Sequence, residues 1–170
     1  MKKLLFNLLC FLFCTYSYSQ VINFPDDNFK TKLLSAVSGN GVAYQCNGNS
    51  FKVDANNDGE IEVSEALLVC SLAISDSNIS DLTGIEFFTN LEHLQCNNNL
   101  ITELDLSALT NIVGFDINNN QLTNVNISGL SEVHNISFRD NQLTTINLLG
   151  LSNLAVLDIR NNQIASLNLE

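Results

Sequence analysis

The sequence predicts an α/β solenoid of short parallel strands with a small helical cap at its N-terminal end. Three observations predict it: a period of 21 to 22 residues, an asparagine at one fixed position of each period, and 26 Asn residues in a chain that is 45% apolar. Asn competes with the backbone for hydrogen bonds in helices and is depleted in strands. A repeated turn that requires Asn explains its abundance.

The composition limits both the size of the fold and its partners. The chain has 170 residues, which corresponds to a single domain of about 100 to 200 residues. Its 18 acidic residues against 7 basic ones give a net charge of −11. Such a chain is too apolar for a disordered acidic tail and too acidic to hold nucleic acid by its phosphates.

The first 19 residues have the pattern of a secretory signal peptide. Lys2 and Lys3 precede an apolar run over residues 4–13, and the small residues Ser17 and Ser19 suit a cleavage site. The run is shorter than the about 20 apolar residues that span a bilayer, and an uncleaved anchor is the alternative. We therefore expect a secreted or cell-surface protein without a transmembrane segment after cleavage. Loss of two lysines leaves a net charge of −13.

Residues 20–68 are expected to form the N-terminal cap. Apolar residues at helical spacing predict a helix over residues 28–37, and a second helix is expected at about residues 62–69. Glycine- and asparagine-rich stretches at residues 39–41 and 47–49 predict turns between the first helix and residue 54.

Within the cap, residues 54–65 fit the calcium-loop pattern D-x-[DN]-x-[DN]-G-x5-E at every constrained position. Side-chain oxygens, one backbone carbonyl at Glu60 and a bidentate carboxylate at Glu65 would suit Ca²⁺, and Gly59 permits the sharp turn. The expected ligands are Asp54, Asn56, Asp58, Glu60, Glu62 and Glu65. The alternative is an acidic Asn-Gly turn that only resembles such a loop.

The surroundings of the loop favour a structural ion over a calcium sensor. A sensor of the EF-hand type has a helix running directly into its loop and usually a second, paired loop. Here only the exit side of the loop is expected to be helical. Single calcium sites in extracellular modules bind at about 0.1 to 1 mM, so the ion would stabilise the junction between the cap and the first repeat.

The remainder of the chain repeats one pattern. Apolar residues occupy positions 1, 4, 6, 11, 14, 16 and 19 of each period and Asn occupies position 9, as in L-x-x-L-x-L-x-x-N-x-L. This is the leucine-rich repeat signature, and it predicts one short strand per repeat, such as residues 94–96. The five repeats are residues 69–90, 91–111, 112–132, 133–153 and the incomplete 154–170.

The recurrent asparagines are expected to form a ladder inside the solenoid. After each strand the chain turns inward, and unpaired backbone groups there would cost about 1 to 3 kcal/mol each. A buried amide can donate to one group and accept from another. The predicted ladder consists of Asn99, Asn120, Asn141 and Asn162, and Ser77 takes the equivalent position in the first repeat.

Outward strand residues form columns on the predicted concave face, which is the surface that solenoids use for recognition. The first column is His93, Gly114, Asn135 and Val156, the second is Gln95, Asp116, Ser137 and Asp158, and the third is Asn97, Asn118, Arg139 and Arg160. Aromatic anchors are nearly absent from it. The alternative is a solvated face without a partner, and the basic pair in the third column is the first target for mutation.

Three cysteines remain after signal cleavage. Cys96 occupies an inward repeat position and is expected to be a buried thiol. Cys46 and Cys70 flank the loop, and export would permit a disulfide, although spacing alone leaves their pairing open.

No catalytic arrangement is recognisable in the sequence. The two histidines, His93 and His134, have no Ser, Cys or Asp partner at a telling spacing, and the carboxylates form no acid and base pair. We therefore expect a non-enzymatic module that recognises an extracellular protein or glycan. The alternatives are the targeting portion of a larger secreted enzyme that continues beyond Glu170, because the last repeat is incomplete, and a calcium buffer or sensor.

Several segments resemble secreted bacterial leucine-rich repeat proteins of the flavobacterial type. Residues 24–29, the loop at residues 54–65 and residues 78–86 carry this resemblance, and residues 79–86 are similar to internalin repeats. The resemblance implies a secreted or cell-surface interaction protein, often with a C-terminal sorting domain that is not found in this sequence.

Overall fold

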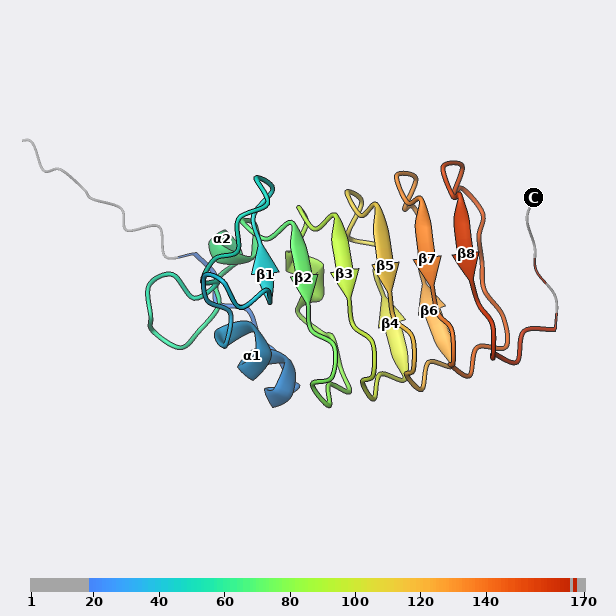
Figure 1. Ribbon diagram of the computed structural model, residues 1–170, viewed down its shortest axis with the longest axis horizontal. Helices are drawn as coiled ribbons and strands as arrows, with labels where there is room; N and C mark the ends of the chain where they lie inside the picture. Colours follow the sequence, from blue (N-terminus) through green and yellow to red (C-terminus); the bar gives the residue numbers. More distant parts are fainter. Residues whose placement is uncertain (1–18, 166, 168–170) are drawn as a thin grey trace, which may run out of the picture.

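The computed structural model describes residues 19–165 and 167, so the predicted signal peptide lies almost wholly outside the described part. A row of short strands follows two helices along the long axis of the molecule (Figure 1). The elements are α1 (Asp27–Leu34), β1 (Ala43–Tyr44), α2 (Val63–Ala66), β2 (Ser71–Ala73), η1 (Ile85–Phe87), β3 (His93–Gln95), β4 (Glu103–Asp105), β5 (Gly114–Asp116), β6 (Asn124–Asn126), β7 (Asn135–Ser137) and β8 (Val156–Asp158).

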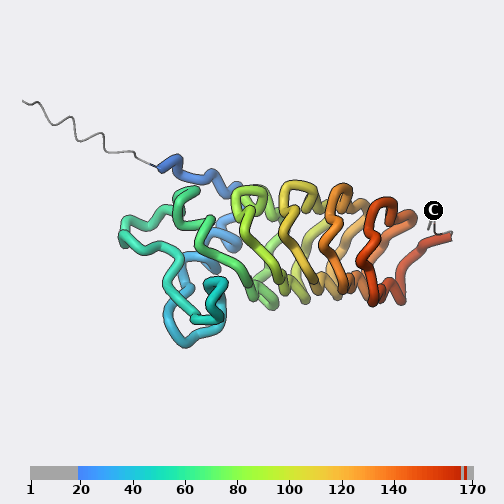
Figure 2. The backbone as a smooth tube through the Cα atoms, turned by 90° about the horizontal axis from the view of Figure 1, so that it is seen from above, coloured from blue at the N-terminus to red at the C-terminus, as the bar shows by residue number. Residues whose placement is uncertain are grey.

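The strands form two sheets. The larger has the order β1-β2-β3-β5-β7-β8, in which β1 is antiparallel to β2 and every later pair is parallel. The smaller contains β4 and β6, also parallel. Figure 2, seen from above, shows the coils stacked one behind another. The predicted parallel-strand solenoid with repeats of about 21 residues is confirmed.

One continuous apolar core runs through the coils. The inward residues of the repeat pattern are buried, and the rings of Phe115 and Phe138 on neighbouring coils lie 5.3 Å apart between centroids. Residues that are buried on β3, β5 and β7 are Leu94, Phe115 and Ile136. Stacking of neighbours therefore supplies the burial that a single 21-residue coil lacks.

The cap helices are shorter than the sequence predicts. Helix α1 ends at Leu34, three residues before the expected end, where Ser35 Oγ donates to the carbonyl of Lys32. Ser forms such local bonds readily, and they compete with continuation of a helix. Helix α2 is a single turn, Val63–Ala66, in place of the expected residues 62–69.

Asp26 joins the cap to the first repeat. Its Oδ1 caps α1 by accepting from the backbone N–H groups of Asn28 and Phe29, both at 2.9 Å. Its Oδ2 accepts from the N–H and Oγ of Ser80, both at 2.7 Å, and from the N–H of Asp81 at 3.2 Å. The carboxylate therefore links residues more than 50 positions apart.

The buried asparagine position connects successive coils. Asn120 Oδ1 accepts from Ile101 N–H at 3.1 Å and its Nδ2 donates to the carbonyl of Cys96 at 3.0 Å. Equivalent bonds are made at Asn99, Asn141 and Asn162. In the first repeat, Ser77 instead donates its backbone N–H to Asn99.

Candidate functional site

The loop at residues 54–65 lies in the N-terminal end of the molecule, between β1 and α2 (Figure 1). Its turn is built by side chains that accept from the backbone: Asp58 N–H donates to Asn56 Oδ1 and Glu60 N–H donates to Asp58 Oδ1, both at 2.9 Å. Gly59 has φ +83°, a conformation that side chains disfavour. The local sequence thus dictates a tight turn that gathers acidic residues.

Glu65 folds the end of the loop back onto its beginning. Its Oε1 accepts from Ala55 N–H at 2.7 Å and its Oε2 accepts from Glu62 N–H at 3.1 Å. The side chains of Glu62 and Glu65 are both buried. The last predicted ligand is therefore held beside the first, Asp54.

The electrostatics of the loop are unfavourable without a cation. The pKa of Glu62 is raised to about 7 by a shared hydrogen bond with Glu65, by burial and by the charges of Glu65 and Asp58. Asp54 is 6% exposed, and its Oδ1 has no hydrogen-bond partner among the described residues. A buried carboxylate oxygen without a partner is costly, and a hard cation would satisfy it.

The two lysines near the loop leave the predicted ligand set in place. Lys30 Nζ lies 2.6 Å from Glu60 Oε2, so the Glu60 carboxylate is engaged outside the loop. That is compatible with a residue expected to offer only its backbone carbonyl. Lys52 Nζ lies 3.6 Å from Asp54 Oδ2 and compensates part of the negative charge there.

A second group of metal-ligand side chains has another explanation. Cys46, Cys70 and Glu92 are, in the described part of the chain, the trio whose ligand atoms lie within 4.8 Å of one another. Cys46 and Cys70 are joined as a disulfide, with their Cα atoms 5.0 Å apart, so their sulfurs are not available as thiolates. The loop carboxylates are spaced more widely than this trio.

The loop is attached to the N-terminal segment through its backbone. Ile61, whose side chain is fully buried, accepts at its carbonyl from Ile22 N–H at 2.9 Å. Val63 N–H donates to the carbonyl of Gln20 at 2.9 Å. A change in the loop would therefore be transmitted to the cap core and to the segment that leads into α1.

The second candidate surface is the outward face of the six-stranded sheet, here called the sheet face. Strand register aligns its columns as the spacing predicts: His93 lies beside Gly114, and Gln95 lies beside Asp116. The columns continue through Asn135 and Val156, and through Ser137 and Asp158. Polar side chains thus lie in rows about one strand spacing apart, close to 4.8 Å.

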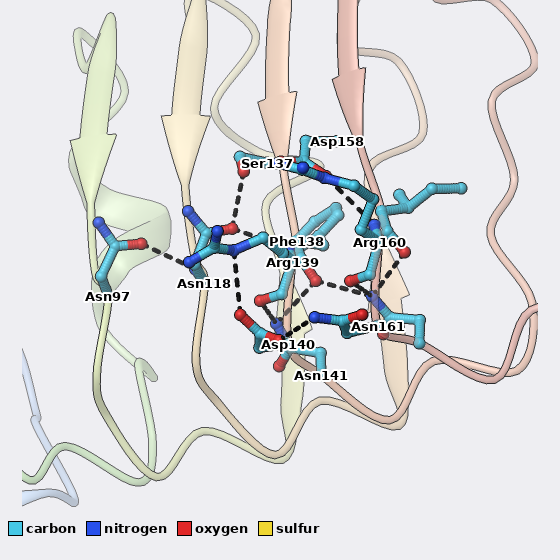
Figure 3. Close-up of polar contacts among 12 residues, drawn as sticks. Asn97, Asn118, Ser137, Phe138, Arg139, Asp140, Asn141, Asp158, Arg160 and Asn161 are labelled. Atoms are coloured by element: carbon cyan, nitrogen blue, oxygen red, sulfur yellow. Dashed lines mark hydrogen bonds and ion pairs between the residues drawn. The ribbon is translucent and has the colours of Figure 1, made fainter.

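Two members of the third column hold the coils together. Asn97 Oδ1 accepts from Asn118 N–H, and Asn118 Oδ1 accepts from Arg139 N–H and Ser137 Oγ, each at 2.7 Å (Figure 3). Ser75 Oγ continues this row by accepting from Asn97 N–H at 3.0 Å. Sequence reasoning missed this second ladder, whose signal was a polar residue two positions before each buried Asn.

The two arginines of the sheet face are each paired with a carboxylate. Arg160 forms two bonds to Asp158, at 2.7 and 2.9 Å, and Arg139 Nε lies 3.0 Å from Asp140 Oδ2 (Figure 3). The bond from Arg160 lowers the pKa of Asp158 to about 2. This end of the sheet face therefore presents alternating charges at neutral pH, with no pair of free cations among the described residues.

The cysteine and histidine expectations can also be placed. Cys96 is fully buried, and burial raises the pKa of its thiol to about 12. His93 is exposed on β3, and His134 Nδ1 lies 2.8 Å from the carbonyl of Glu132. No described helix is long and apolar enough to cross a membrane.

Fold and repeat geometry define a leucine-rich repeat solenoid of the internalin type. A family model described as the LRR domain of endo-beta-N-acetylglucosaminidase EndoS matches residues 60–168, and the chain belongs to this family. Internalin J of Listeria monocytogenes serotype 4b is 36% identical over 84 residues, which are 49% of this chain and 7% of that protein.

Solved internalin structures share the fold. The functional domain of InlJ from Listeria monocytogenes has a TM-score of 0.71 and 27% identity, and the match covers 89% of this chain and 31% of that one. An internalin (InlF) and internalin C2 from the same species match with TM-scores of 0.52 and 0.50 at 18% and 21% identity, covering 84% and 86% of this chain and 45% and 71% of theirs. The chain thus spans less than a third of the InlJ domain.

A cysteine ladder is stated for the InlJ domain. In the described part of the present chain, Cys96 is the one free cysteine, and the repeated inter-coil bonds are made by asparagine. The two solenoids therefore share repeat geometry and differ in which side chains recur along it.

Proposed function

We propose that the protein is an exported recognition module that binds a protein partner through the sheet face and carries a structural Ca²⁺ in its cap. The observation that carries the first part is the register-aligned array of polar side chains on a rigid row of parallel strands. Extended faces of this kind are what solenoids use for recognition. A glycan partner is the other outcome of the binding test.

Export is supported by two independent features. The first is the signal-peptide pattern of residues 1–19. The second is the Cys46–Cys70 disulfide, because disulfides persist mainly in oxidising compartments. Secreted and cell-surface locations both agree with these features.

The structural calcium site is supported by the donor chemistry of the loop. Asp54, Asn56, Asp58 and Glu65 offer side-chain oxygens, and Glu60 offers its carbonyl. Glu62 binds directly or through water. A bound ion would offset the repulsion that raises the pKa of Glu62 and would satisfy Asp54 Oδ1.

The calcium proposal predicts stabilisation by the ion. With a dissociation constant of about 0.1 to 1 mM, 5 mM Ca²⁺ would add about 1 to 2 kcal/mol to the free energy of unfolding. Thermal unfolding with and without Ca²⁺ measures this, and Asp54→Ala and Glu65→Gln should abolish the increase. Glu60→Gln is the matched control, because only the carbonyl of Glu60 is assigned to the ion. An equal increase in Tm in all four proteins would contradict the assignment.

The partner is sought with the protein lacking only its predicted signal peptide. It is immobilised, exposed to proteins and glycans of its native environment, and each retained molecule is then purified and titrated. Arg139→Gln/Arg160→Gln should weaken binding at least about tenfold, since both side chains lie on the sheet face. The control Thr144→Glu/Thr145→Glu changes the net charge by the same −2 at two exposed positions outside that face. Equal binding by both variants would exclude the basic pair from the interface.

The family match favours a second candidate function. Because the family is named for the LRR domain of an enzyme, the solenoid could serve as the recognition portion of a larger secreted enzyme. The complete open reading frame tests this candidate. A hydrolase domain encoded beyond Glu170 would support it and would assign the sheet face a role in substrate targeting.

A further inference from the structure

A groove lies beside the smaller sheet, on a side of the solenoid that the proposed function does not use. It has a volume of about 580 Å³ and lies between the segment at residues 80–86 and the strands β4 and β6. Outward side chains of Glu103 and Asp105 on β4 and of Asn124 on β6 line it. We call it the acidic groove.

The groove carries negative charge without a basic counterpart. Asp81, Glu86, Glu103 and Asp105 line it, and none of its lining residues is basic. Hydrogen bonds from Ser107 and Asn126 lower the pKa of Asp105, which therefore stays ionised.

Basic side chains of the described chain are mostly engaged elsewhere. Lys30 pairs with Glu60, and Lys52 lies near Asp54, both in the cap. The two arginines pair with aspartates on the larger sheet. The groove is thus complementary to a cationic partner.

The groove also borders an unpaired strand edge. Strand β4 pairs with β6 on one side only. On its other side the preceding coil forms η1 instead of a strand, and in the described part of the chain no backbone hydrogen bond joins residues 80–86 to β4. The N–H and C=O groups at that edge are available to another strand.

We propose that the acidic groove binds an extended peptide segment with Lys or Arg at alternate positions, which adds a strand to the free edge of β4. Alternate side chains of a strand point to the same face, so every second residue would lie over the carboxylates while the backbone pairs with β4. Main-chain bonds then supply affinity and the charges supply selectivity.

The probe is an acetylated and amidated hexapeptide of alternating Lys and Thr, titrated by NMR into the signal-free protein at 25 mM and 150 mM NaCl. We expect chemical-shift changes centred on β4 and on residues 80–86, with binding at least about threefold weaker at the higher salt. A second probe of the same sequence is N-methylated on alternate residues. It keeps every charge and cannot form the strand ladder, so its affinity should fall at least about tenfold.

Glu103→Lys tests the groove itself. Glu103 is exposed and takes part in no side-chain hydrogen bond in the described structure, so the variant should fold normally. It should weaken binding at least about tenfold, whereas Glu132→Lys makes the same charge change at an exposed site outside the groove and should leave binding unchanged.

Three results would overturn the proposal. They are no binding of the probe at 25 mM NaCl, equal affinity for the N-methylated probe, or equal weakening by the two Lys variants. Arg139→Gln/Arg160→Gln should bind the probe as the wild type does, so failure of the sheet-face proposal and failure of this one are distinguishable.

Discussion

Three consecutive asparagines, Asn118, Asn119 and Asn120, illustrate how one residue type meets three separate requirements. Asn118 accepts from the next coil at the surface, and Asn120 bonds backbone groups inside the solenoid. Asn119 has φ +53°, and Asn is one of the few side chains that tolerate this region. The abundance of Asn therefore arises from the turn that every coil repeats.

These three roles predict different responses to mutation. Asn120→Ala leaves Ile101 N–H and the carbonyl of Cys96 without the amide, and should lower the free energy of unfolding by about 2 to 4 kcal/mol. Asn119→Gly preserves the backbone conformation and should change it by less than about 1 kcal/mol. Urea denaturation of both variants provides the measurement. Similar losses for the two would contradict the assignment of separate roles.

Asp26 gives the fold a defined dependence on pH. Burial opposes its ionisation, but hydrogen bonds from Ser80, Phe29 and Asp81 outweigh this effect and lower its pKa below 3.8. A carboxylate with a lowered pKa in the folded state contributes stability that is complete above the unfolded-state pKa. That contribution is lost as the pH falls through the folded-state pKa.

Asp26→Ala should therefore lower the free energy of unfolding by about 2 to 3 kcal/mol at pH 7, through loss of the helix cap and of the bonds to the first repeat. The difference from the wild type should stay constant from pH 7 to 5 and shrink below about pH 4. Denaturant titrations across this range measure it. Asp27→Ala, a neighbouring exposed carboxylate, is the control, and a comparable loss there would argue against the role of Asp26.

At the residue scale, regular spacing was the informative signal. The buried ladder could be predicted because Asn99, Asn120 and Asn141 recur at intervals of 21. The surface ladder of Ser75, Asn97 and Asn118 could not, since its chemistry changes from a hydroxyl to an amide and then to arginine. Asp26 lies far in sequence from Ser80, and only the folded chain brings them together.

At the scale of elements, repeated units were predictable and unique ones were not. The strand expected at residues 94–96 is present as His93–Gln95, displaced by one residue. In contrast, α1 and α2 are shorter than expected, and η1 replaces a strand in the first repeat. A unit that occurs once has no period to locate its ends, and local capping bonds decide them.

The Cys46–Cys70 disulfide is an element-scale crosslink between the segment after β1 and the start of β2. It closes a separation of 24 residues, for which restriction of the unfolded chain contributes about 3 kcal/mol. Cys46→Ser/Cys70→Ser should lower the free energy of unfolding by about this amount. A reductant should have the same effect on the wild type and no further effect on the double variant. Insensitivity of the wild type to reductant would contradict the prediction.

For the whole molecule, stability depends on contacts between neighbouring coils. Each coil buries its apolar residues against the next through one continuous core, and its backbone carbonyls accept from the following coil, as when Ile117 N–H donates to Ser137. A solenoid of this kind behaves as a chain of coupled units. The cap and the central coils should therefore unfold together, whereas a coil with one neighbour can open separately.

Two equivalent isoleucines test this coupling, because Ile117 and Ile159 occupy the same repeat position two coils apart. Ile117 is fully buried between neighbours, and Ile159, in the last described coil, is only partly buried. Ile117→Ala should cost about 2 to 4 kcal/mol and accelerate amide exchange in the coils on both sides. Ile159→Ala should cost about 1 kcal/mol, with faster exchange confined to its own coil. If Ile117→Ala accelerated exchange only in its own coil, the units would be independent, and the sheet face could not act as one rigid surface.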